Sequence, residues 1–269
     1  MFNASHLNVR YGQRTIIHDL SFSAKAGELT AIVGPNGSGK STLLKAITGE
    51  IASLGDISLD GANIRNASPA ELATRRAVLP QSTTIAFPFT VMEIVRIGVE
   101  AGGSASPSLA LRALSRVGLA GYEGRTYNEL SGGEQQRCQL ARVLCQVWHP
   151  KTGDQPNWLL LDEPVSALDI GHQLEVMRIA REYADNGGGV IAVMHDLNLT
   201  AMFADSVALM RGGEILRQDT PQKVLTNAYL SEAYGCPLQI STPPVDGNIP
   251  YILPQAAQFH QPRSPSMAQ

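Results

Sequence analysis

The sequence runs Gly34-Pro35-Asn36-Gly37-Ser38-Gly39-Lys40-Ser41 directly after the largely apolar run Leu29 to Val33, and continues as a helix pattern from Thr42. This segment matches G-x-x-x-x-G-K-[ST] in the order strand, loop and helix. Its glycines let the backbone curl around a phosphate, and the free amides of the new helix point at the anion. Lys40 supplies a positive charge for the β- and γ-phosphates, and the Ser41 hydroxyl can bind Mg²⁺. The segment therefore predicts a phosphate-binding loop, and the alternative is a glycine-rich turn that matches by chance.

Composition limits the class of protein. The chain has 269 residues, of which 43% are hydrophobic and 17% are charged, so it can bury the core of one large domain or of two lobes. The net charge of −3 argues against a non-specific nucleic-acid binder. The sequence has no apolar run of the ~18 residues that span a bilayer, no secretory signal at its N-terminus, and no metal-site spacing among its three cysteines. These features predict a cytoplasmic protein that works on membranes through partners.

Hydrophobic periodicity predicts short strands that alternate with helices, which is typical of an α/β fold. The predicted strands are 7–9, 16–22, 29–33, 57–59, 78–79, 158–161 and 190–194, with a hairpin at 207–216. The predicted helices are 69–76, 91–99, 109–117, 136–147, 171–183, 197–203, 221–225 and 230–234. We expect 57–59 at a sheet edge, 78–79 in the core, a polar loop at 150–157 and a poorly ordered end in the last dozen residues.

A second glycine-containing helix start lies at Ser131-Gly132-Gly133-Glu134. Ser131 and Glu134 stand three residues apart before an apolar helical pattern, which predicts a capping box. The two glycines between them leave the helix N-terminus bare, and such termini bind anions readily. We therefore favour an anion site, although a well-capped helix without a ligand is the alternative.

Polar residues follow two predicted core strands. Asp162 and Glu163 come directly after 158–161, at the end of the strand where open α/β sheets bind ligands. One carboxylate could hold Mg²⁺ and the other could orient an attacking water, or both could cap the next helix. His195 follows 190–194 at the same sheet edge, so we expect it to meet the nucleotide even though a lone histidine is more often structural.

The roles of two further residues are undecided when each residue is considered alone. Gln81 ends the predicted strand 78–79 and could equally be a solvated loop residue. Tyr11 lies at a strand end on the nucleotide side, where an ordinary half-buried tyrosine is the favoured interpretation.

The complete set of motifs resembles the nucleotide-binding subunit of ABC transporters over about the first 240 residues. The set is the phosphate loop, Gln81, L-S-G-G-E at 130–134, L-L-L-D-E-P at 159–164, S-A-L-D at 166–169 and M-H-D at 194–196. The resemblance implies an α/β P-loop cassette with a RecA-like core, an N-terminal antiparallel β-subdomain and a helical signature subdomain. It places the nucleotide-binding domain at 1–240, with the helical subdomain inserted at about 85–150, and leaves a partly disordered extension at 241–269.

The same resemblance implies ATP and Mg²⁺ as cofactors and assigns roles to residues. The nucleotide would contact Tyr11 (stacking on adenine), Gly34, Pro35, Asn36, Gly37, Ser38, Gly39, Lys40, Ser41 and Thr42. The γ-phosphate held by the opposite subunit would contact Ser131, Gly132, Gly133 and Glu134. The metal would contact Ser41, Gln81 and Asp162. The catalytic residues would be Glu163 as base, His195 at the γ-phosphate, Lys40 and Gln81, the last also sensing the membrane partner. Asp169 would lie at the dimer interface.

The assembly that the resemblance implies is a head-to-tail homodimer with two ATP molecules between the subunits. Because Ser131 belongs to the helical insert, we do not expect one subunit to bring it onto its own phosphate loop. The partners would be integral membrane permease subunits and, indirectly, a periplasmic substrate-binding protein, with no nucleic acid. The protein would be peripheral, on the cytoplasmic face of the bacterial inner membrane.

Within this family the sequence is most similar to importers of iron chelates, haem or vitamin B12. The similar segments are F-P-F-T-V-M-E-I-V-R-I-G at 87–98 and H-D-L-N-L-T at 195–200. The run E-Q-Q-R-C-Q-L-A-R-V-L-C-Q-V-W at 134–148 and the polar loop after it look closest to bacterial haem importers, while Val165 stands where many relatives carry threonine. We expect an ATPase that drives haem import. The alternatives are import of a ferric siderophore or cobalamin and, in a different class, a soluble ABC ATPase without a transport role.

Overall fold

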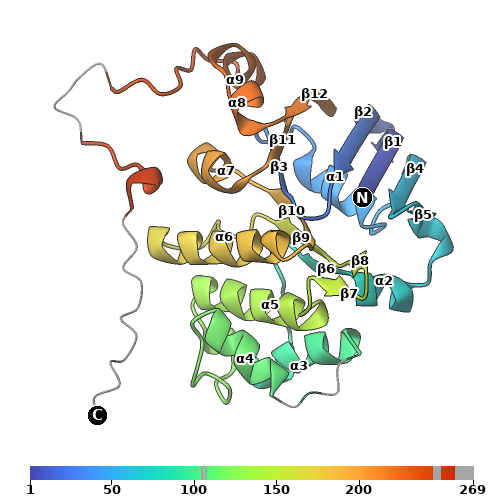
Figure 1. Ribbon diagram of the computed structural model, residues 1–269, viewed down its shortest axis with the longest axis vertical. Helices are drawn as coiled ribbons and strands as arrows, with labels where there is room; N and C mark the ends of the chain where they lie inside the picture. The colour runs from blue at the N-terminus through green and yellow to red at the C-terminus, as the bar shows by residue number, and fades with distance from the viewer. Residues whose placement is uncertain (104–105, 107, 245–249, 258–269) are drawn as a thin grey trace.

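The computed structural model of the chain describes residues 1–103, 106, 108–244 and 250–257, and it shows two main sheets with helices packed around them (Figure 1). The predicted α/β class and the N-terminal antiparallel sheet are confirmed. The expectation of a poorly ordered end concerns the last dozen residues of a partly disordered extension at 241–269, and residues 245–249 and 258–269 of that extension lie outside the described residues. The domain boundaries at about 85, 150 and 240 stay predictions.

The larger sheet contains six strands: β3 (Leu29–Val33), β6 (Arg76–Leu79), β9 (Trp158–Asp162), β10 (Gly189–Val193), β11 (Ser206–Arg211) and β12 (Glu214–Asp219). Their order is β12-β11-β3-β10-β9-β6. All neighbours pair in parallel except β11 and β12, which form the predicted hairpin. The segment 78–79 was expected in the core, and β6 is indeed largely buried, but it lies at the edge of the sheet.

Alternate residues of the parallel strands face two different cores, which is why these strands are mostly apolar on both faces. Leu159 and Leu161 of β9 belong to the core between the sheet and the helices on one of its faces. Leu160 joins the core on the opposite face, with helix α1 (Lys40–Ile47) and the smaller sheet. The helical core is built from α3 (Val91–Ala101), α4 (Leu109–Arg116), α5 (Gly132–Gln146), α6 (Ile170–Asp185), α7 (Leu197–Phe203), α8 (Pro221–Val224) and α9 (Asn227–Tyr234). No helix in the described part of the chain is long and apolar enough to cross a membrane.

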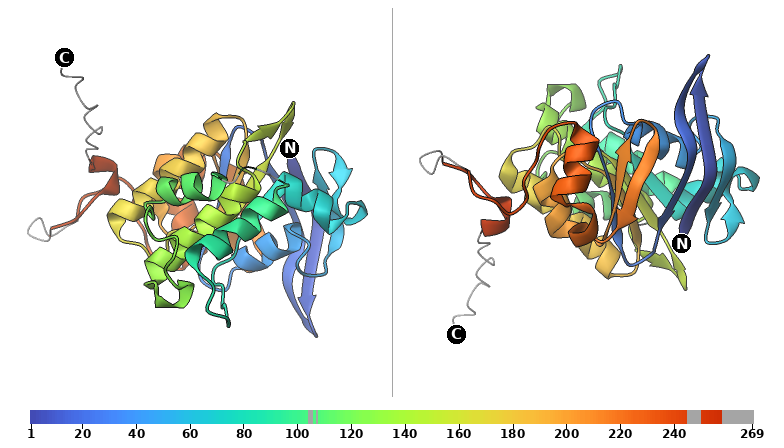
Figure 2. Two further views of the ribbon diagram at one scale, coloured as in Figure 1. Left: turned by 90° about the horizontal axis from the view of Figure 1, so that it is seen from below. Right: turned by 90° about the horizontal axis from the view of Figure 1, so that it is seen from above.

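The smaller sheet is antiparallel and has the order β2-β1-β4-β5. Its strands are β1 (Phe2–Tyr11), β2 (Arg14–Ala24), β4 (Leu54–Leu59) and β5 (Ala62–Asn63). Figure 2 shows this sheet flanking the larger one on the side away from α6. The two are joined through Phe2, whose ring packs edge-on against Trp158 of β9 with centroids 5.5 Å apart. The segment 57–59 was expected at an edge, but the two-residue strand β5 pairs with Ser58 and Leu59 on its outer side.

Two short segments differ in how well local patterns predicted them. Helix α2 (Pro69–Arg75) begins with the predicted capping box, in which Ser68 and Glu71 exchange hydrogen bonds. The segment 150–157 was expected to be a polar loop, but it contains a ribbon of β7 (Lys151–Thr152) and β8 (Gln155–Pro156). Gly153 turns this ribbon with a φ of +61°, and its exposed polar residues carry no alternation from which a strand could be recognised.

Three helices, α3, α4 and α5, lie between β6 and β9 in the chain, within the segment 85–150 for which the sequence predicts a helical subdomain. That subdomain stays a prediction. Helices α3 and α5 approach each other closely at Gly98 of α3. A Cβ atom at Gly98 would lie 1.9 Å from the backbone carbonyl oxygen of Arg142 in α5. The atoms that the added Cβ would meet belong to the backbone of Arg142, so the clash cannot be relieved by the movement of a flexible side chain.

We therefore expect Gly98→Ala to destabilise the protein. Overpacking should cost about 3 kcal/mol, which outweighs the gain of about 1 kcal/mol in helix propensity. Urea unfolding measures the difference, and Gly124→Ala is the control because its Cβ would meet nothing within 4 Å. Equal stabilities of the two variants would contradict the close helix approach.

Candidate functional site

The carboxyl ends of four neighbouring parallel strands meet at one edge of the larger sheet. The register pairs Val193 of β10 with Ile32 of β3 and with Asp162 of β9, and it pairs Leu79 of β6 with Leu161. The chain leaves each strand within one or two residues of these pairs. The residues that follow the four strand ends are Gly34, Gln81, Glu163 and His195.

The loop after β3 needs glycine at specific positions. Gly34 has a φ of +149°, and a Cβ there would lie 2.2 Å from the carbonyl oxygen of Met210 in β11. Gly39, at the N-cap of α1, has a φ of +101°. Side chains would strain both positions, so the glycines let the loop lie against β11 and enter the helix.

Lys40 is the first residue of α1 and lies back on the loop. Its Nζ donates hydrogen bonds to the carbonyl oxygens of Gly34 and Pro35, at 2.9 and 3.0 Å. Burial lowers the pKa of Lys40, and the charges of Glu163 and Asp162 oppose this shift. The ammonium group is therefore held by neutral carbonyls that an anion could replace.

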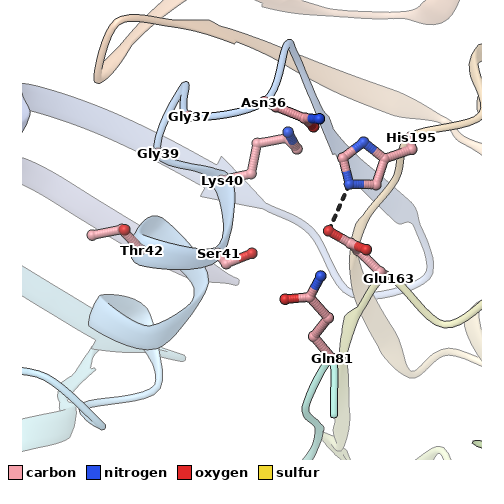
Figure 3. Close-up of a pocket in the computed structure, with 9 residues that line it drawn as sticks. All are labelled: Asn36, Gly37, Gly39, Lys40, Ser41, Thr42, Gln81, Glu163 and His195. Atoms are coloured by element: carbon pink, nitrogen blue, oxygen red, sulfur yellow. Dashed lines mark hydrogen bonds and ion pairs between the residues drawn. The ribbon is translucent and has the colours of Figure 1, made fainter. Parts of the chain in front are cut away.

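A cavity of about 560 Å³ opens above the loop. It is lined by Asn36, Gly37, Gly39, Lys40, Ser41, Thr42, Gln81, Glu163 and His195. In Figure 3 the side chains of Lys40, Glu163 and His195 converge from different elements, whereas Thr42 points away from them. The structure thus brings together nine of the residues that the sequence singles out. Gly34, Pro35 and Ser38 belong to the same loop but do not line the cavity.

Ser41 and Asp162 form a polar pair beside this cavity. The Ser41 hydroxyl donates a hydrogen bond of 3.0 Å to Oδ1 of the buried Asp162. Burial raises the pKa of Asp162, the Ser41 hydrogen bond opposes the shift, and the charge of Glu163 adds to it. In the described residues, no group of three or more His, Cys, Asp and Glu could hold a metal. A hydroxyl and a carboxylate are oxygen donors of the kind Mg²⁺ accepts, provided that phosphate and water supply the other ligands.

Glu163 and His195 form a second polar pair. Nε2 of His195 and Oε1 of Glu163 are 2.6 Å apart (Figure 3). The side chain of Glu163 is 12% exposed and that of His195 is 42% exposed. The carboxylate is therefore largely shielded, whereas the imidazole is open to a ligand in the cavity.

The predicted capping box at Ser131 is present, but it lies away from the cavity above the phosphate loop. Ser131 accepts a hydrogen bond from the Glu134 amide, while the Glu134 carboxylate accepts from the Ser131 amide and hydroxyl at 2.8 Å each. These hydrogen bonds, the one from the Ser131 hydroxyl first, lower the pKa of Glu134. Gly132 lines a second cavity of about 180 Å³, which Gln81 also borders. Anion binding at this helix start stays a prediction.

Two other predicted residues lie at the surface outside the first cavity. Tyr11 is 52% exposed at the end of β1 and does not line the cavity. Asp169 caps α6 by accepting a hydrogen bond of 2.9 Å from the His172 amide. The roles assigned to them, adenine stacking and a dimer contact, stay predictions.

The sequence did not point to Tyr234, the last residue of α9. Burial raises the pKa of Tyr234, and the backbone amide of Gly34, the first glycine of the phosphate loop, opposes the shift. The tyrosine hydroxyl therefore lies near the phosphate loop. An ion pair of 3.7 Å between Arg211 and Glu232 also joins α9 to the hairpin beside the loop. A helix-end tyrosine carries no local pattern that would reveal so distant a contact.

Tyr234→Phe should lower the free energy of unfolding by about 1 kcal/mol, because it removes the hydroxyl that lies near the Gly34 amide. Thermal and urea unfolding of the nucleotide-free protein measure the loss. Tyr229→Phe removes a hydroxyl from the same helix and is the matched control. A Tyr234→Phe protein as stable as this control would rule out the contact.

Comparisons with known proteins give a family match, relatives in sequence and solved structures of the same fold. Residues 17–166 match the ABC transporter family. Relatives named "Hemin import ATP-binding protein HmuV" include those of Jannaschia sp. (strain CCS1), 59% identical over 96% of each chain, and Rhizobium meliloti (strain 1021), 53% identical over 96% of this chain and 99% of the relative. A solved ATP-binding cassette, dimeric in a post-hydrolysis state with ADP and Pi, is 25% identical, with a TM-score of 0.71 over 82% of this chain and 99% of that one. A nucleotide-free cassette from an ABC transporter, 24% identical, shares the fold with a TM-score of 0.74 over 87% of this chain and 98% of that one.

Proposed function

Because this chain belongs to the ABC transporter family and is an ATP-hydrolysing subunit, we propose that it powers the import of haem (hemin) across the bacterial inner membrane. The observation that carries the cargo assignment is the identity of 50–59%, over nearly the full length, with relatives named for hemin import. The residues at the strand ends would bind the phosphates of a nucleotide and would not contact the cargo. Import of a ferric siderophore or cobalamin is therefore the alternative that the test must separate.

ATP would occupy the cavity above the phosphate loop. The loop amides and Lys40 would bind the β- and γ-phosphates, so that Lys40 exchanges two neutral carbonyl acceptors for charged oxygens. Ser41, Asp162 and Gln81 would hold Mg²⁺. When bound, Mg²⁺ supplies positive charge that offsets the negative charge of the phosphate oxygens. The Ser41–Asp162 pair, a hydroxyl against a buried carboxylate, supports this assignment.

Glu163 would act as the general base. Its carboxylate would accept a proton from a water molecule whose oxygen attacks the γ-phosphorus, and the bond to ADP would break. His195, now 2.6 Å from Glu163, would contact the γ-phosphate. The shielded position of Glu163 supports this role, because a side chain that is only 12% exposed has little contact with bulk water.

Two subunits would enclose the nucleotides head to tail. The helix start at Ser131 lies outside the cavity of its own chain, so a second chain is needed to bring a Ser131-Gly132-Gly133 segment to the γ-phosphate. The dimeric structure of a similar cassette supports this arrangement. The start lies on a proposed helical subdomain at about 85–150, within a nucleotide-binding domain at 1–240. ATP would join the two chains, and hydrolysis would release them.

Glu163→Gln should bind ATP, hydrolyse it very slowly and accumulate as a dimer, because the γ-phosphate that joins the subunits persists. Light scattering after size exclusion, with and without ATP and Mg²⁺, measures the dimer. Lys40→Ala/Glu163→Gln is the control and should stay monomeric, since its phosphate loop lacks the charge that holds the nucleotide. A Glu163→Gln protein that stays monomeric at saturating ATP would contradict the sandwich.

The membrane partners would be permease subunits, which in turn receive cargo from a periplasmic binding protein. Phe87 and Phe89, 69% and 39% exposed, lie between Gln81 and α3 with ring centroids 6.2 Å apart. Exposed aromatic residues of this kind favour protein contacts. Their position next to Gln81 supports a permease contact beside the nucleotide and a peripheral location on the cytoplasmic face.

Growth of a deletion strain on haem as its only iron source tests the cargo. Haem-dependent growth should fail, return with the wild-type chain and stay absent with Lys40→Ala, because that variant cannot turn over ATP. The same strains are grown in parallel with a ferric siderophore as the only iron source. Failure on the siderophore alone would overturn haem as cargo and keep the transporter. Normal growth on both sources, in a strain without another importer, would favour cobalamin.

A further inference from the structure

The backbone of Glu163 adopts a conformation that its neighbours must hold in place. Its φ is +52°, in the left-handed region that residues with a Cβ rarely occupy. Its amide donates to the carbonyl oxygen of Val193 at 3.1 Å, which fixes the turn on the side of β10. Its own carbonyl oxygen accepts from the amide and hydroxyl of Ser166, at 3.3 and 3.2 Å. The conformation therefore depends on hydrogen bonds at both ends of the residue.

Gln136 of α5 spans this turn from the helical insert. Its Nε2 donates to the carbonyl oxygen of Glu163 at 2.8 Å, and its Oε1 accepts from the amide of Ala167 at 3.3 Å. One carboxamide thus uses its donor and its acceptor on the first and fifth residues of the same turn. Gln136 also lines the smaller cavity, together with Gly132 and Gln81.

We propose that Gln136 is a positioning residue for Glu163, through which the orientation of α5 sets where the catalytic carboxylate lies. The hydrogen bond to the Glu163 carbonyl fixes the peptide plane that follows the residue. Because the backbone at Glu163 is strained, loss of that bond lets the peptide rotate and carries the carboxylate away from His195. The proposal rests on the proposed role of Glu163 as base.

Helix α5 carries both the proposed anion site at Ser131 and the residue that contacts the Glu163 turn, Gln136. Helix α5 begins beside Ser131, and Gln136 lies about one and a half turns further, roughly 8 Å along the axis at ~1.5 Å per residue. A nucleotide bound at the helix start by the second subunit would shift or stiffen α5. Gln136 would transmit that change to the Glu163 of its own chain, which serves the other nucleotide of the sandwich.

Gln136→Met tests the proposal because it keeps the side-chain length and removes both polar contacts. We expect kcat for ATP hydrolysis to fall roughly 10- to 100-fold, since displacement of a catalytic group by a fraction of an ångström to 1 Å costs up to this factor. The KM and the dissociation constant for ATP should stay within about twofold, because the phosphate loop is untouched. Gln136→Glu keeps an oxygen that accepts from the Ala167 amide and loses the group that donates to the Glu163 carbonyl. This variant replaces Gln136→Met in the test if the methionine variant does not fold.

Gln146→Met is the matched control on the same helix. The Gln146 amide donates to the backbone carbonyls of Ala73 and Arg76, at 2.8 and 3.0 Å, so it joins α5 to the core just as Gln136 does. It does not reach the Glu163 turn. We expect this variant to keep kcat within about twofold. If Gln146→Met lowers kcat as much as Gln136→Met, the effect is a general loosening of α5 and the proposal fails.

A double-mutant cycle with Glu163→Gln separates this proposal from the proposed function. If Gln136 acts through the Glu163 carboxylate, adding Gln136→Met to Glu163→Gln should cause little further loss in single-turnover hydrolysis. Losses that multiply would overturn the positioning role while leaving Glu163 as base. Full hydrolysis by Glu163→Gln alone would instead overturn the base assignment itself, and with it the proposal.

Discussion

The register of four parallel strands is the constraint on which the nucleotide site depends. Residues of β3, β10 and β9 pair at Ile32, Val193 and Asp162, and β6 joins at Leu79. A shift of one residue in any strand would turn its side chains to the opposite face and withdraw its last polar residue from the cavity. The buried strand interiors, packed against two cores, oppose such a shift because it would exchange two buried faces at once.

The charged side chains at this edge, and Ser41, are paired with groups of the same chain. Lys40 donates to loop carbonyls, Ser41 donates to Asp162, and His195 lies against Glu163. Buried polar groups without partners are costly, so these pairs stabilise the site before a ligand arrives. Nucleotide binding then exchanges one set of hydrogen bonds for another. Because the side chains are already held in place, the loss of conformational entropy on binding is small.

Local patterns predicted the parts of the site that local physics determines. The phosphate loop follows from glycine spacing, and the capping boxes at Ser68 and Ser131 follow from residues three apart. The ribbon at 151–156 and the inner position of β4 were missed, because each depends on a two-residue strand too short to show a pattern. The contacts of Gln136 with Glu163 and of Tyr234 with Gly34 join segments distant in sequence. No spacing or propensity encodes such contacts, so they need coordinates.

The dependence of Gly34 on Met210 and Tyr234 has a consequence for synthesis of the chain. The phosphate loop leaves the ribosome early, whereas β11 and α9, which back it, leave near the end. Pairing of β3 with β10 and β11 also waits for late residues, and such non-local pairing is slow to form. A nascent chain released or cleaved before β11 therefore carries every signature motif of an ATPase, while its phosphate loop lacks the strand that packs against Gly34. Premature chains of this kind would be targets for chaperones and proteases.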